Sequence, residues 1–348
     1  MTTPGNPMDT EKPDLAARLM GIINSSWMSQ AVCVAARLGI ADHLTKGPQR
    51  ADALATKIGC HAPSLNRLLR ALVSLDVCRQ REDERYELTP MGALLRTSTQ
   101  NSLRAWAIWW GTYLWPVWGH LLHSITTGEP ARSLVTGTPG FRPLENDAAM
   151  ADTFNAAMVE LTRLIAGTAT DSYDFSPIRC IADIGGGYGE LLATILKAHP
   201  AMRGILIDLP HALRGARQHL ETAGVRDRCD IIAGDFFDSI PTGADAYLLK
   251  SIIHDWDDDR AGDILENCRR AMSPGARLLL VEHIMPERME PTAFHQSLSR
   301  MDLNMLVAHG SRERTEAELR ALLAAHRLSL RRIVHTRMNF AIIEATPN

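Results

Sequence analysis

A glycine-rich segment between two apolar runs constrains this chain more than any other feature. It spans residues 183–190 and reads Asp-Ile-Gly-Gly-Gly-Tyr-Gly-Glu. Cys180–Ala182 before it has the character of a buried strand, and Leu191–Ala198 after it has helical apolar spacing. Glycine is needed at such a strand–turn–helix junction, because the backbone turns sharply and a ligand approaches where a Cβ atom would collide. The segment therefore predicts an α/β unit with a ligand site at the start of a helix.

The spacing of the glycines indicates the ligand. A dinucleotide-binding loop reads Gly-x-Gly-x-x-Gly, whereas here glycines occupy positions 185, 187 and 189, and Glu190 stands where that loop has its third glycine. The pattern Asp-x-Gly-x-Gly-x-Gly resembles motif I of the class I methyltransferases, which bind S-adenosylmethionine (SAM). SAM carries an amino group that an acidic neighbour suits. The resemblance assigns Asp183, Gly185 and Gly187 to SAM, and a plain tight turn is the alternative.

Size, charge and cysteine content limit the class of protein. The 348 residues are enough for a large core and two domains. A net charge of −3 argues against a protein built mainly to bind nucleic acid. The six cysteines include no Cys-x-x-Cys pair, which favours reduced thiols in a cytoplasmic protein. Residues 1–13 are predicted to be a flexible tail without signal-peptide features, and no apolar run is expected to reach membrane-spanning length.

Residues 14–100 are predicted to form a winged-helix domain. Helical apolar spacing covers the segments Leu15–Ile23, Gln30–Leu44, Ala51–Ile58 and Ala62–Leu75. A two-stranded wing is expected over Asp76–Thr89. DNA recognition is one role for this order of elements, but the recognition segment carries only Arg67 and Arg70, and residues 82–84 of the wing are acidic, which opposes phosphate binding. Dimerisation and covering of a substrate are the favoured roles.

Residues 101–170 are predicted to be a helical linker and substrate-covering region. Five of the seven tryptophans lie between positions 106 and 118. Aromatic residues at helical spacing usually pack in a core, but so dense a cluster also suits the wall of a pocket for a flat apolar ligand.

Residues 171–348 alternate strand and helix patterns, as a doubly wound sheet does. The predicted strands are Arg179–Asp183, Gly204–Asp208, Asp230–Ala233, Ala244–Leu249 and Arg277–Glu282. Leu328–His335 and Asn339–Glu344 are expected to form an antiparallel hairpin at one edge of the sheet. The fold class is therefore α/β, with a Rossmann-like domain after a mostly helical one.

Several residues lie where a SAM site needs them. Asp208 ends the second strand, 23 residues after the first glycine of the loop, and suits the two ribose hydroxyls; Leu209 beside it is assigned to the same site. Asp235 is expected to bond the adenine amino group and Phe236 to lie against the base. Lys250 ends the fourth strand at the same carboxyl edge, where open α/β sheets bind ligands.

A histidine just beyond the fourth strand is the candidate catalytic group. Methyl transfer from a sulfonium is an in-line displacement, so the acceptor must be oriented and made nucleophilic. A phenol of pKa ~10 is mostly protonated at neutral pH, and a general base works best when its own pKa lies near ~7. Histidine meets this requirement. His254 is predicted to be the base, and a helix cap or a packing role is the alternative.

Residues 250–256 read Lys-Ser-Ile-Ile-His-Asp-Trp. With this segment, the chain resembles along most of its length the plant caffeate-type O-methyltransferases and their bacterial natural-product relatives, whose pattern is Lys-x-x-x-His-Asp-Trp. The resemblance implies that His254 is a general base held by Glu282 and Glu313. Gly310-Ser311 replaces the Gly-Gly of the plant pattern. A carboxylate on one ring nitrogen fixes the tautomer and raises the basicity of the other.

The resemblance also implies an acceptor pocket and a set of partners. The residues assigned to the acceptor are Trp106, Trp110, Phe154, Met158, Asp255, Met301 and Met305. Aromatic and methionine side chains suit a planar molecule. Because the plant substrate residues near 107–108 are not reproduced, a bacterial secondary metabolite such as a polyketide or phenazine phenol is expected rather than caffeate. A homodimer through the N-terminal domain, SAM as donor with S-adenosylhomocysteine as its product, and no metal, nucleic acid or membrane are implied.

Three other functions remain open. N-methylation of a heteroaromatic ring needs no base, so the presence of His254 with Glu282 favours oxygen as the acceptor. Metal-assisted transfer is suggested by acidic residues at 255 and 257–259, although these suit the start of a helix better. The third is a SAM-binding relative redirected to hydroxylation, decarboxylation or regulation.

Overall fold

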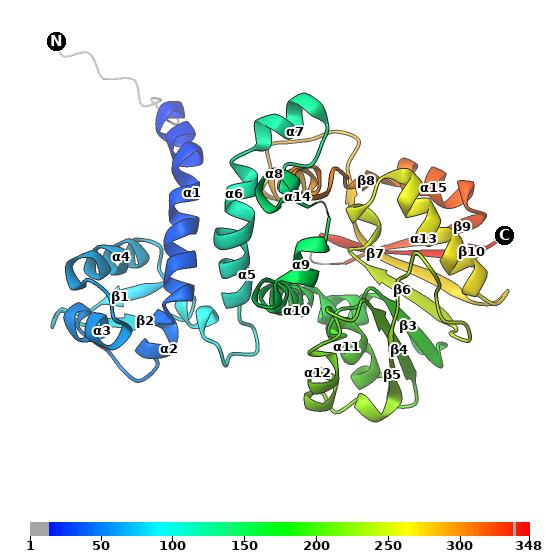
Figure 1. The fold of residues 1–348 in the computed structure, drawn as a ribbon, viewed down its shortest axis with the longest axis horizontal. Coiled ribbons are helices and arrows are strands. Elements are labelled where there is room, and N and C mark those ends of the chain that lie inside the picture. Colours follow the sequence, from blue (N-terminus) through cyan, green and yellow to red (C-terminus); the bar gives the residue numbers. More distant parts are fainter. Residues whose placement is uncertain (1–13, 139, 337–338) are drawn as a thin grey trace, which may run out of the picture. The chain divides into compact units, whose positions relative to one another are not determined.

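The computed structural model describes residues 14–138, 140–336 and 339–348, and the chain divides into two compact units (Figure 1). The N-terminal unit is Met1–Gly111 and the C-terminal unit is Thr112–Asn348. The tail predicted at residues 1–13 lies outside the described residues. The helical stretch expected at 101–170 is divided between the two units.

The N-terminal unit contains helices and one small hairpin. Its elements are α1 (Leu15–Arg37), α2 (Ile40–Leu44), α3 (Ala51–Ile58), α4 (Ala62–Ser74), β1 (Cys78–Gln80), β2 (Tyr86–Leu88), η1 (Gly92–Leu95) and α5 (Arg104–Trp109). Strands β1 and β2 pair antiparallel. Leu54, Leu69, Leu72 and Tyr86 are fully buried at the centre of this unit. The predicted winged-helix order of elements is present.

Helix α1 is a single helix where two were predicted. The polar residues at its middle do not interrupt it, because the Ser25 hydroxyl donates to the Ile22 carbonyl at 2.8 Å and stays within the helix. The helix ends instead near Gly39, whose φ of +62° is left-handed. At 23 residues, α1 has the length and apolar composition of a membrane-spanning helix, so the expectation that no run reaches that length was wrong. Core helices of soluble proteins and signal sequences also pass this test.

The C-terminal unit is a mixed sheet with helices on both faces. Its helices are α6 (Trp115–Trp118), α7 (Leu121–Thr127), α8 (Arg132–Thr136), α9 (Arg142–Asn146), α10 (Ala148–Ser172), α11 (Glu190–Ala198), α12 (Ala216–Thr222), η3 (Arg226–Arg228), η4 (Ile253–Asp255), α13 (Asp258–Ala271), α14 (Ala293–His309) and α15 (Glu316–Ala325). A π-helical turn, η2 (Trp110–Leu114), spans the boundary between the units.

The sheet has the strand order β5-β4-β3-β6-β7-β10-β9. Its strands are β3 (Cys180–Ile184), β4 (Arg203–Asp208), β5 (Cys229–Ala233), β6 (Ala246–Lys250), β7 (Arg277–Met285), β8 (Arg314–Thr315), β9 (Leu328–His335) and β10 (Phe340–Pro347). Strands β3 to β7 are parallel, and β10 runs antiparallel to β7 and β9. Every strand predicted from the sequence is present, and the short β8, which pairs with β7, was not predicted.

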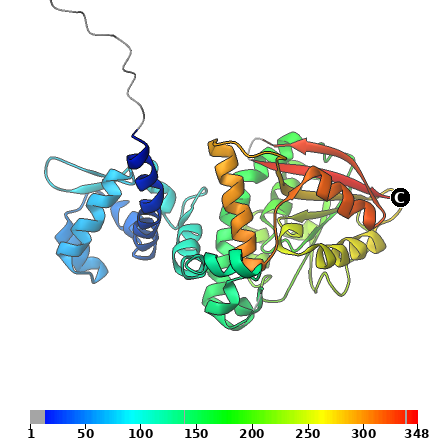
Figure 2. The same cartoon turned by 90° about the horizontal axis from the view of Figure 1, so that it is seen from above.

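The strand order of the sheet determines at which edge a ligand is able to bind. From β3 the chain proceeds to β4 and β5 on one side and returns to β6 on the other, which creates a switch point beside β3. Residues of α10, α11 and α12 pack on one face, and residues of α13 and α15 on the other. Helix α14, orange in Figure 2, contacts α6, α7, α8 and η4. The carboxyl ends of β3, β4 and β6 therefore meet at one edge.

Candidate active site

The glycine loop adopts a backbone that other residues disfavour. Gly185, Gly187 and Gly189 have φ values of +70°, +58° and +79°. A Cβ atom at Gly186 would lie 2.5 Å from the Asp183 Oδ2 atom, so this glycine is needed for close packing instead. At Gly187 nothing lies within 4 Å of such an atom, so the loop faces open space there.

Asp208 is held by the same loop. Its Oδ2 atom accepts from the Gly187 N–H at 2.8 Å, and its Oδ1 atom accepts from the Leu209 N–H at 2.7 Å. Burial raises the pKa of Asp208 to about 6. Burial, with the charge of Asp208 nearby, raises the pKa of Asp183 to about 7. Buried Asp183 and half-buried Asp208 form an acidic pair that suits hydrogen-bond donors and a cation, which the ribose hydroxyls and the amino group of SAM provide.

The remaining predicted SAM residues surround the loop at the ends of β5 and β6. A Cβ atom at Gly185 would lie 3.4 Å from the Phe236 ring, so this ring borders the loop. The Asn267 amide donates to the Phe236 carbonyl at 2.8 Å. The Asp235 carboxylate accepts a hydrogen bond from the backbone N–H of Phe237. Lys250 is half-buried. Its removal from water lowers its pKa, while the charges of Glu282, Asp255 and Asp183 act in the opposite direction.

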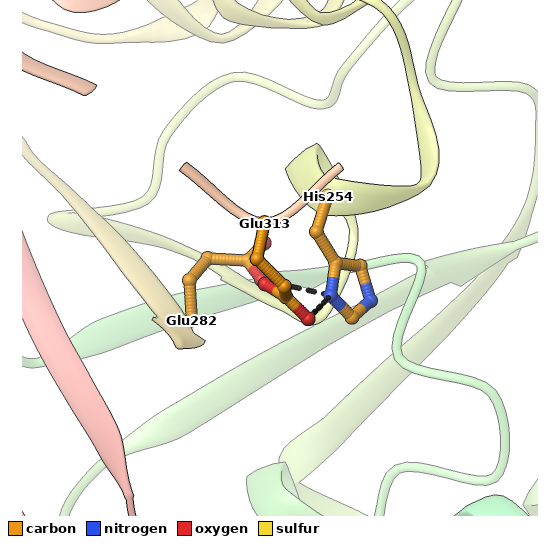
Figure 3. Close-up of side chains that lie close together, drawn as sticks. All are labelled: His254, Glu282 and Glu313. Carbon is orange, nitrogen blue, oxygen red and sulfur yellow. Dashed lines mark hydrogen bonds and ion pairs between the residues drawn. The ribbon is translucent and has the colours of Figure 1, made fainter. Parts of the chain in front are cut away.

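His254 lies in η4, directly after a strained turn. Ser251 adopts a left-handed φ of +55°, which turns the chain sharply at the end of β6. The His254 Nδ1 atom lies 2.9 Å from Glu313 Oε1 and 3.7 Å from Glu282 Oε2. Figure 3 shows both carboxylates on the Nδ1 side of the ring and Nε2 on the other side. Glu282 is itself fixed, because its Oε1 atom accepts from the backbone N–H groups of residues 252 and 253 at 3.0 and 2.9 Å.

The charges of this cluster are strongly coupled. Burial would lower the pKa of His254, but the charges of Glu313, Glu282 and Asp255 outweigh burial and raise it to about 10. Burial and the nearby Glu313 raise the pKa of Glu282 to about 7, although His254 opposes this change. Burial would also raise the pKa of Glu313, but His254 outweighs it and lowers this pKa. A proton on the ring is therefore stabilised chiefly by the charge of Glu313.

The same three side chains have the composition of a metal site. One imidazole nitrogen and two carboxylate oxygens, from His254, Glu282 and Glu313, lie within 4.8 Å of one another. The Oε2 atoms of both glutamates are buried without a hydrogen-bond partner. These groups are able to hold a proton or a cation between them.

The acceptor residues predicted in the C-terminal unit occupy two helices and η4. Asp255 is adjacent to His254, with its Oδ1 atom 3.6 Å from His254 Nε2. Phe154 and Met158 lie on α10, and Met301 and Met305 lie on α14. Trp106 and Trp110 belong to the N-terminal unit, at α5 and η2, and their relation to an acceptor stays a prediction.

Sequence reasoning missed several residues around His254. His309 of α14 lies with its Nε2 atom 3.5 Å from Asp255 Oδ1, and the Phe141 ring centroid is 4.8 Å from that of His309. Burial raises the pKa of Asp255 to about 6, and the positive charge of buried Arg132 opposes this change. Arg314, directly after Glu313, is 2% exposed and contacts the His254 turn. No local pattern signals these residues, because α8, α14 and β8 meet η4 only in the folded chain.

Two family models match the chain and together account for most of it. The model of the O-methyltransferase dimerisation domain matches residues 20–98, and that of the O-methyltransferase domain matches residues 118–327. The second of these includes the glycine loop, His254 and both glutamates.

Individual relatives are similar over nearly the whole chain. Phenazine O-methyltransferase PhzM of Lysobacter antibioticus is 42% identical over 96% of this chain and 96% of that protein. Mitomycin biosynthesis 6-O-methyltransferase of Streptomyces lavendulae is 36% identical over 95% of this chain and 94% of that protein. The solved structure of LaPhzM matches with a TM-score of 0.92 and 41% identity, covering 96% of this chain and 99% of that one.

Similarity extends to proteins with other named activities. An 8-amino-8-demethylriboflavin N,N-dimethyltransferase of Streptomyces davaonensis is 35% identical over 91% of this chain and 92% of that protein. Aclacinomycin 10-hydroxylase RdmB of Streptomyces purpurascens is 34% identical over 94% of this chain and 88% of that protein. The family models and the near full-length similarity nevertheless agree with the geometry of the site: the chain belongs to the family of SAM-dependent O-methyltransferases that carry a dimerisation domain.

Proposed function

We propose that this enzyme methylates a hydroxyl group of a small aromatic molecule, with His254 as the general base. The observation that carries the proposal is the buried His254 ring, whose Nδ1 atom is held 2.9 Å from Glu313 while Nε2 lies on the opposite side. A ring held in this way donates from Nδ1 and accepts a proton at Nε2. Glu313 and Glu282 then stabilise the imidazolium that forms.

The pKa of His254 lies near that of a phenol rather than near neutral pH. Its pKa of about 10 is close to the ~10 of an unperturbed phenol, so transfer of the proton between them is nearly balanced. The sequence argument expected a value near ~7, and the structure differs because three carboxylates surround the ring. SAM supplies the methyl group when bound, and its positive sulfonium favours the neutral form of a neighbouring imidazole.

The chain's own residues would hold the donor at the edge of the sheet. Those assigned to it are Asp183, Gly185, Gly187, Asp208, Leu209, Asp235, Phe236 and Lys250. The carboxylates of Asp183 and Asp208 would take the amino group and the ribose hydroxyls, and the space beside Gly187 would admit these groups of the donor. Half-buried Lys250, which lies near several acidic groups, would balance their charge.

A planar acceptor would lie against aromatic and methionine side chains. Phe154, Met158, Met301, Met305 and Asp255 are assigned to it, together with the two tryptophans of the N-terminal unit. The relatives named for phenazine O-methylation and for mitomycin biosynthesis suggest a fused-ring secondary metabolite. We also propose a cytoplasmic homodimer that works without a metal. The dimerisation domain supports the homodimer, as does α1, where Trp27 is 65% exposed beside other exposed apolar residues.

The test is methyl transfer from labelled SAM to a panel of hydroxylated phenazines, naphthoates and quinones. We expect His254→Ala to lower kcat on the best hydroxyl acceptor by on the order of 10²–10⁴, because it removes the base. The affinity for SAM, measured by calorimetry, should stay within about twofold. Turnover close to that of the unmodified enzyme would refute the role of His254.

N-methylation is the second candidate, since a similar relative is an N,N-dimethyltransferase. An amine with a free lone pair needs no base, so His254→Ala would leave its methylation largely intact. A panel that includes amino analogues of each hydroxyl acceptor distinguishes the two functions. Formation of an oxidised product without methyl transfer would instead favour a redirected chemistry, of the kind that the name of the hydroxylase relative indicates.

A further inference from the structure

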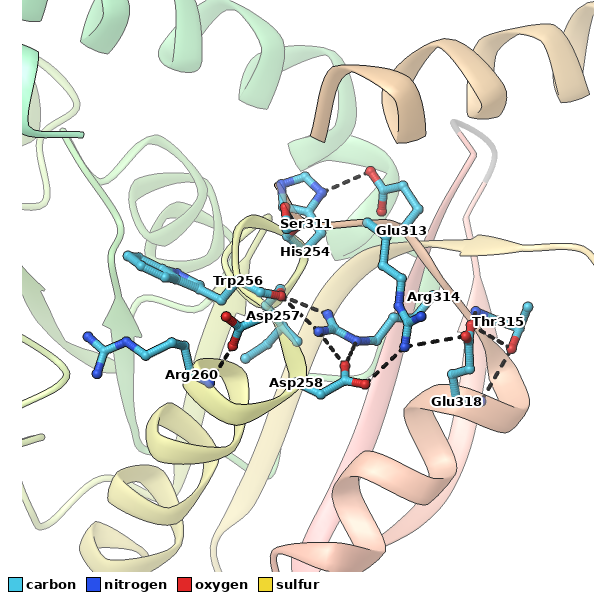
Figure 4. A network of polar contacts seen from close by, with 12 residues as sticks. His254, Trp256, Asp257, Asp258, Arg260, Ser311, Glu313, Arg314, Thr315 and Glu318 are labelled. Atoms are coloured by element: carbon cyan, nitrogen blue, oxygen red, sulfur yellow. Dashed lines mark hydrogen bonds and ion pairs between the residues drawn. The ribbon is translucent and has the colours of Figure 1, made fainter. Parts of the chain in front are cut away.

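Arg314 makes an unusual set of contacts around the turn that carries His254. Its Nη1 atom donates to the Ile253 carbonyl at 2.8 Å, and its Nη2 atom donates to the Trp256 carbonyl at 2.8 Å. Its Nε and Nη2 atoms also donate to Asp258 Oδ1 at 2.9 and 2.8 Å. Figure 4 shows the guanidinium lying between these groups. The two carbonyls belong to the residue before His254 and to the second residue after it.

The chemistry of arginine explains why one side chain is able to do this. A guanidinium is planar and presents five N–H donors in a fixed fork, so it ties several acceptors in one geometry, which a lysine ammonium does not. The cation is 2% exposed, and the Asp258 carboxylate compensates its charge. A buried cation with these acceptors is costly to remove, because each carbonyl would then lose its partner.

The segment that carries Arg314 is itself fixed on both sides. Arg314 and Thr315 form β8 and pair with β7. The Thr315 hydroxyl and the Glu318 carboxylate form a capping box at the start of α15. On the other side, the Ser311 hydroxyl donates to the His254 carbonyl at 2.6 Å, and the Glu313 N–H donates to Asp302 at 3.0 Å. The segment is therefore a rigid support for the turn it contacts.

From these contacts we infer that Arg314 is a positioning residue, which sets the distance between the His254 ring and the Glu313 carboxylate. The inference rests on the proposed function of His254. Residue 313 supplies the carboxylate, and residue 314 ties the turn of the ring to the same short strand. One segment thus supplies both the partner of the base and the support of its backbone. A shift of about 1 Å in such a pair is expected to cost on the order of 10² in rate.

The matched variants are Arg314→Met, Arg314→Lys, Asp258→Asn and Arg312→Met. Arg312 also contacts Asp258, at 2.9 Å, but it is exposed, and among the described residues its ion pairs are with Asp258 and Glu318 rather than with the His254 turn, so it is the control. We expect kcat to fall by about 10² for Arg314→Met. For Arg314→Lys and Asp258→Asn it should fall by roughly tenfold, because part of the network remains. Arg312→Met should stay within about twofold, as surface variants do.

A second readout separates positioning from simple loss of stability. The His254 ring is followed by NMR of ¹⁵N-labelled histidine as the pH is changed, with His254→Ala to assign its signals. The groups that face or act on the ring are Glu282 and His283 of β7, Glu313, Asp255 and His309 of α14. In folded Arg314→Lys and Asp258→Asn, the ring should titrate at lower pH than in the unmodified enzyme, because Glu313 is no longer aligned. SAM affinity should stay within about twofold.

An unchanged titration of His254 in both folded variants would overturn the inference, whatever their activity. So would a loss of kcat in Arg312→Met equal to that in Asp258→Asn, because that result would assign the effect to the surface network. Failure of the proposed function is distinguishable, since in that case His254→Ala itself would retain kcat.

Discussion

The glycine loop and the His254 cluster lie at the same edge of the sheet, but they are assembled from the chain in different ways. The loop spans residues 183–189, and Asp208 is held by the backbone of Gly187 and Leu209. The cluster joins residues 254, 282 and 313, which come from η4, β7 and the segment before β8. The loop depends on backbone conformation, and the cluster depends on buried charges.

This difference determines how each region should respond to mutation. In the loop, the glycines matter because they have no Cβ atom. A substitution that adds one is therefore expected to lower the affinity for the ligand. In the cluster, every side chain is buried and charged or polar, so changes of charge are expected to act on proton transfer and on its pH dependence. Affinity and pH profile are therefore the two measurements that separate them.

The largest of the effects expected here is that of Glu313→Gln. In the unmodified enzyme, kcat/KM should rise with pH toward about 10, since the proposed base is the neutral form of His254, whose pKa the neighbouring carboxylates raise to about 10. Glu313 raises that pKa, so its replacement lowers the pKa and the profile should level off at lower pH. The plateau should also fall by on the order of 10², because the imidazolium loses its partner.

The measurement is a pH–rate profile that begins at neutral pH and extends above pH 10, with both enzymes at saturating SAM. Glu344→Gln is a control, since this buried carboxylate of β10 accepts hydrogen bonds from Tyr173 and from Arg332 of β9, away from His254. A Glu313→Gln profile that overlays that of the unmodified enzyme would contradict the link between Glu313 and the base.

An intermediate effect is expected in the loop, where two neighbouring glycines provide a matched pair. In Gly186→Ala the new Cβ atom would lie 2.5 Å from Asp183 Oδ2 and 2.6 Å from a Leu206 methyl group. We expect SAM affinity to fall by tenfold or more, about 1.4 kcal/mol, because the Asp183 carboxylate must move. Calorimetry with SAM measures this change.

Gly187→Ala is the partner of that experiment, because its Cβ atom would contact nothing within 4 Å and only its φ of +58° is strained. About 1–2 kcal/mol of strain is expected, mainly as lower thermal stability. If Gly186→Ala bound SAM as tightly as the unmodified enzyme, the steric account of the loop would be wrong.

The smallest effect is expected from removal of metals. His254, Glu282 and Glu313 are close enough together to hold a cation. We propose that they hold a proton, so prolonged dialysis against EDTA should leave kcat within about twofold of its starting value. Loss of activity that a divalent cation restores would instead identify the cluster as a metal centre.

Much of the fold follows from patterns in the sequence. The strands from β3 to β7, β9 and β10 were predicted because apolar runs alternate with helical segments. The polar residues Asp183, Asp208 and Lys250 at the carboxyl ends of three of these runs were recognised in the same way. Helix α1 was predicted as two helices, Leu15–Ile23 and Gln30–Leu44. The polar residues between them do not interrupt it, because the Ser25 hydroxyl donates to the helix backbone. β8 has only two residues, too few to give a periodic signal.

The sequence alone therefore determined the glycine loop, the acidic ends of the strands and the segment around His254, because each depends on neighbours close in the chain. Only the tertiary structure decided how basic His254 is, since that depends on carboxylates 28 and 59 residues away in a shared, water-excluding interior. It also decided which side chain contacts the turn that carries His254. Arg314 contacts a turn 58 to 61 residues earlier, and a contact that distant follows from packing rather than from spacing.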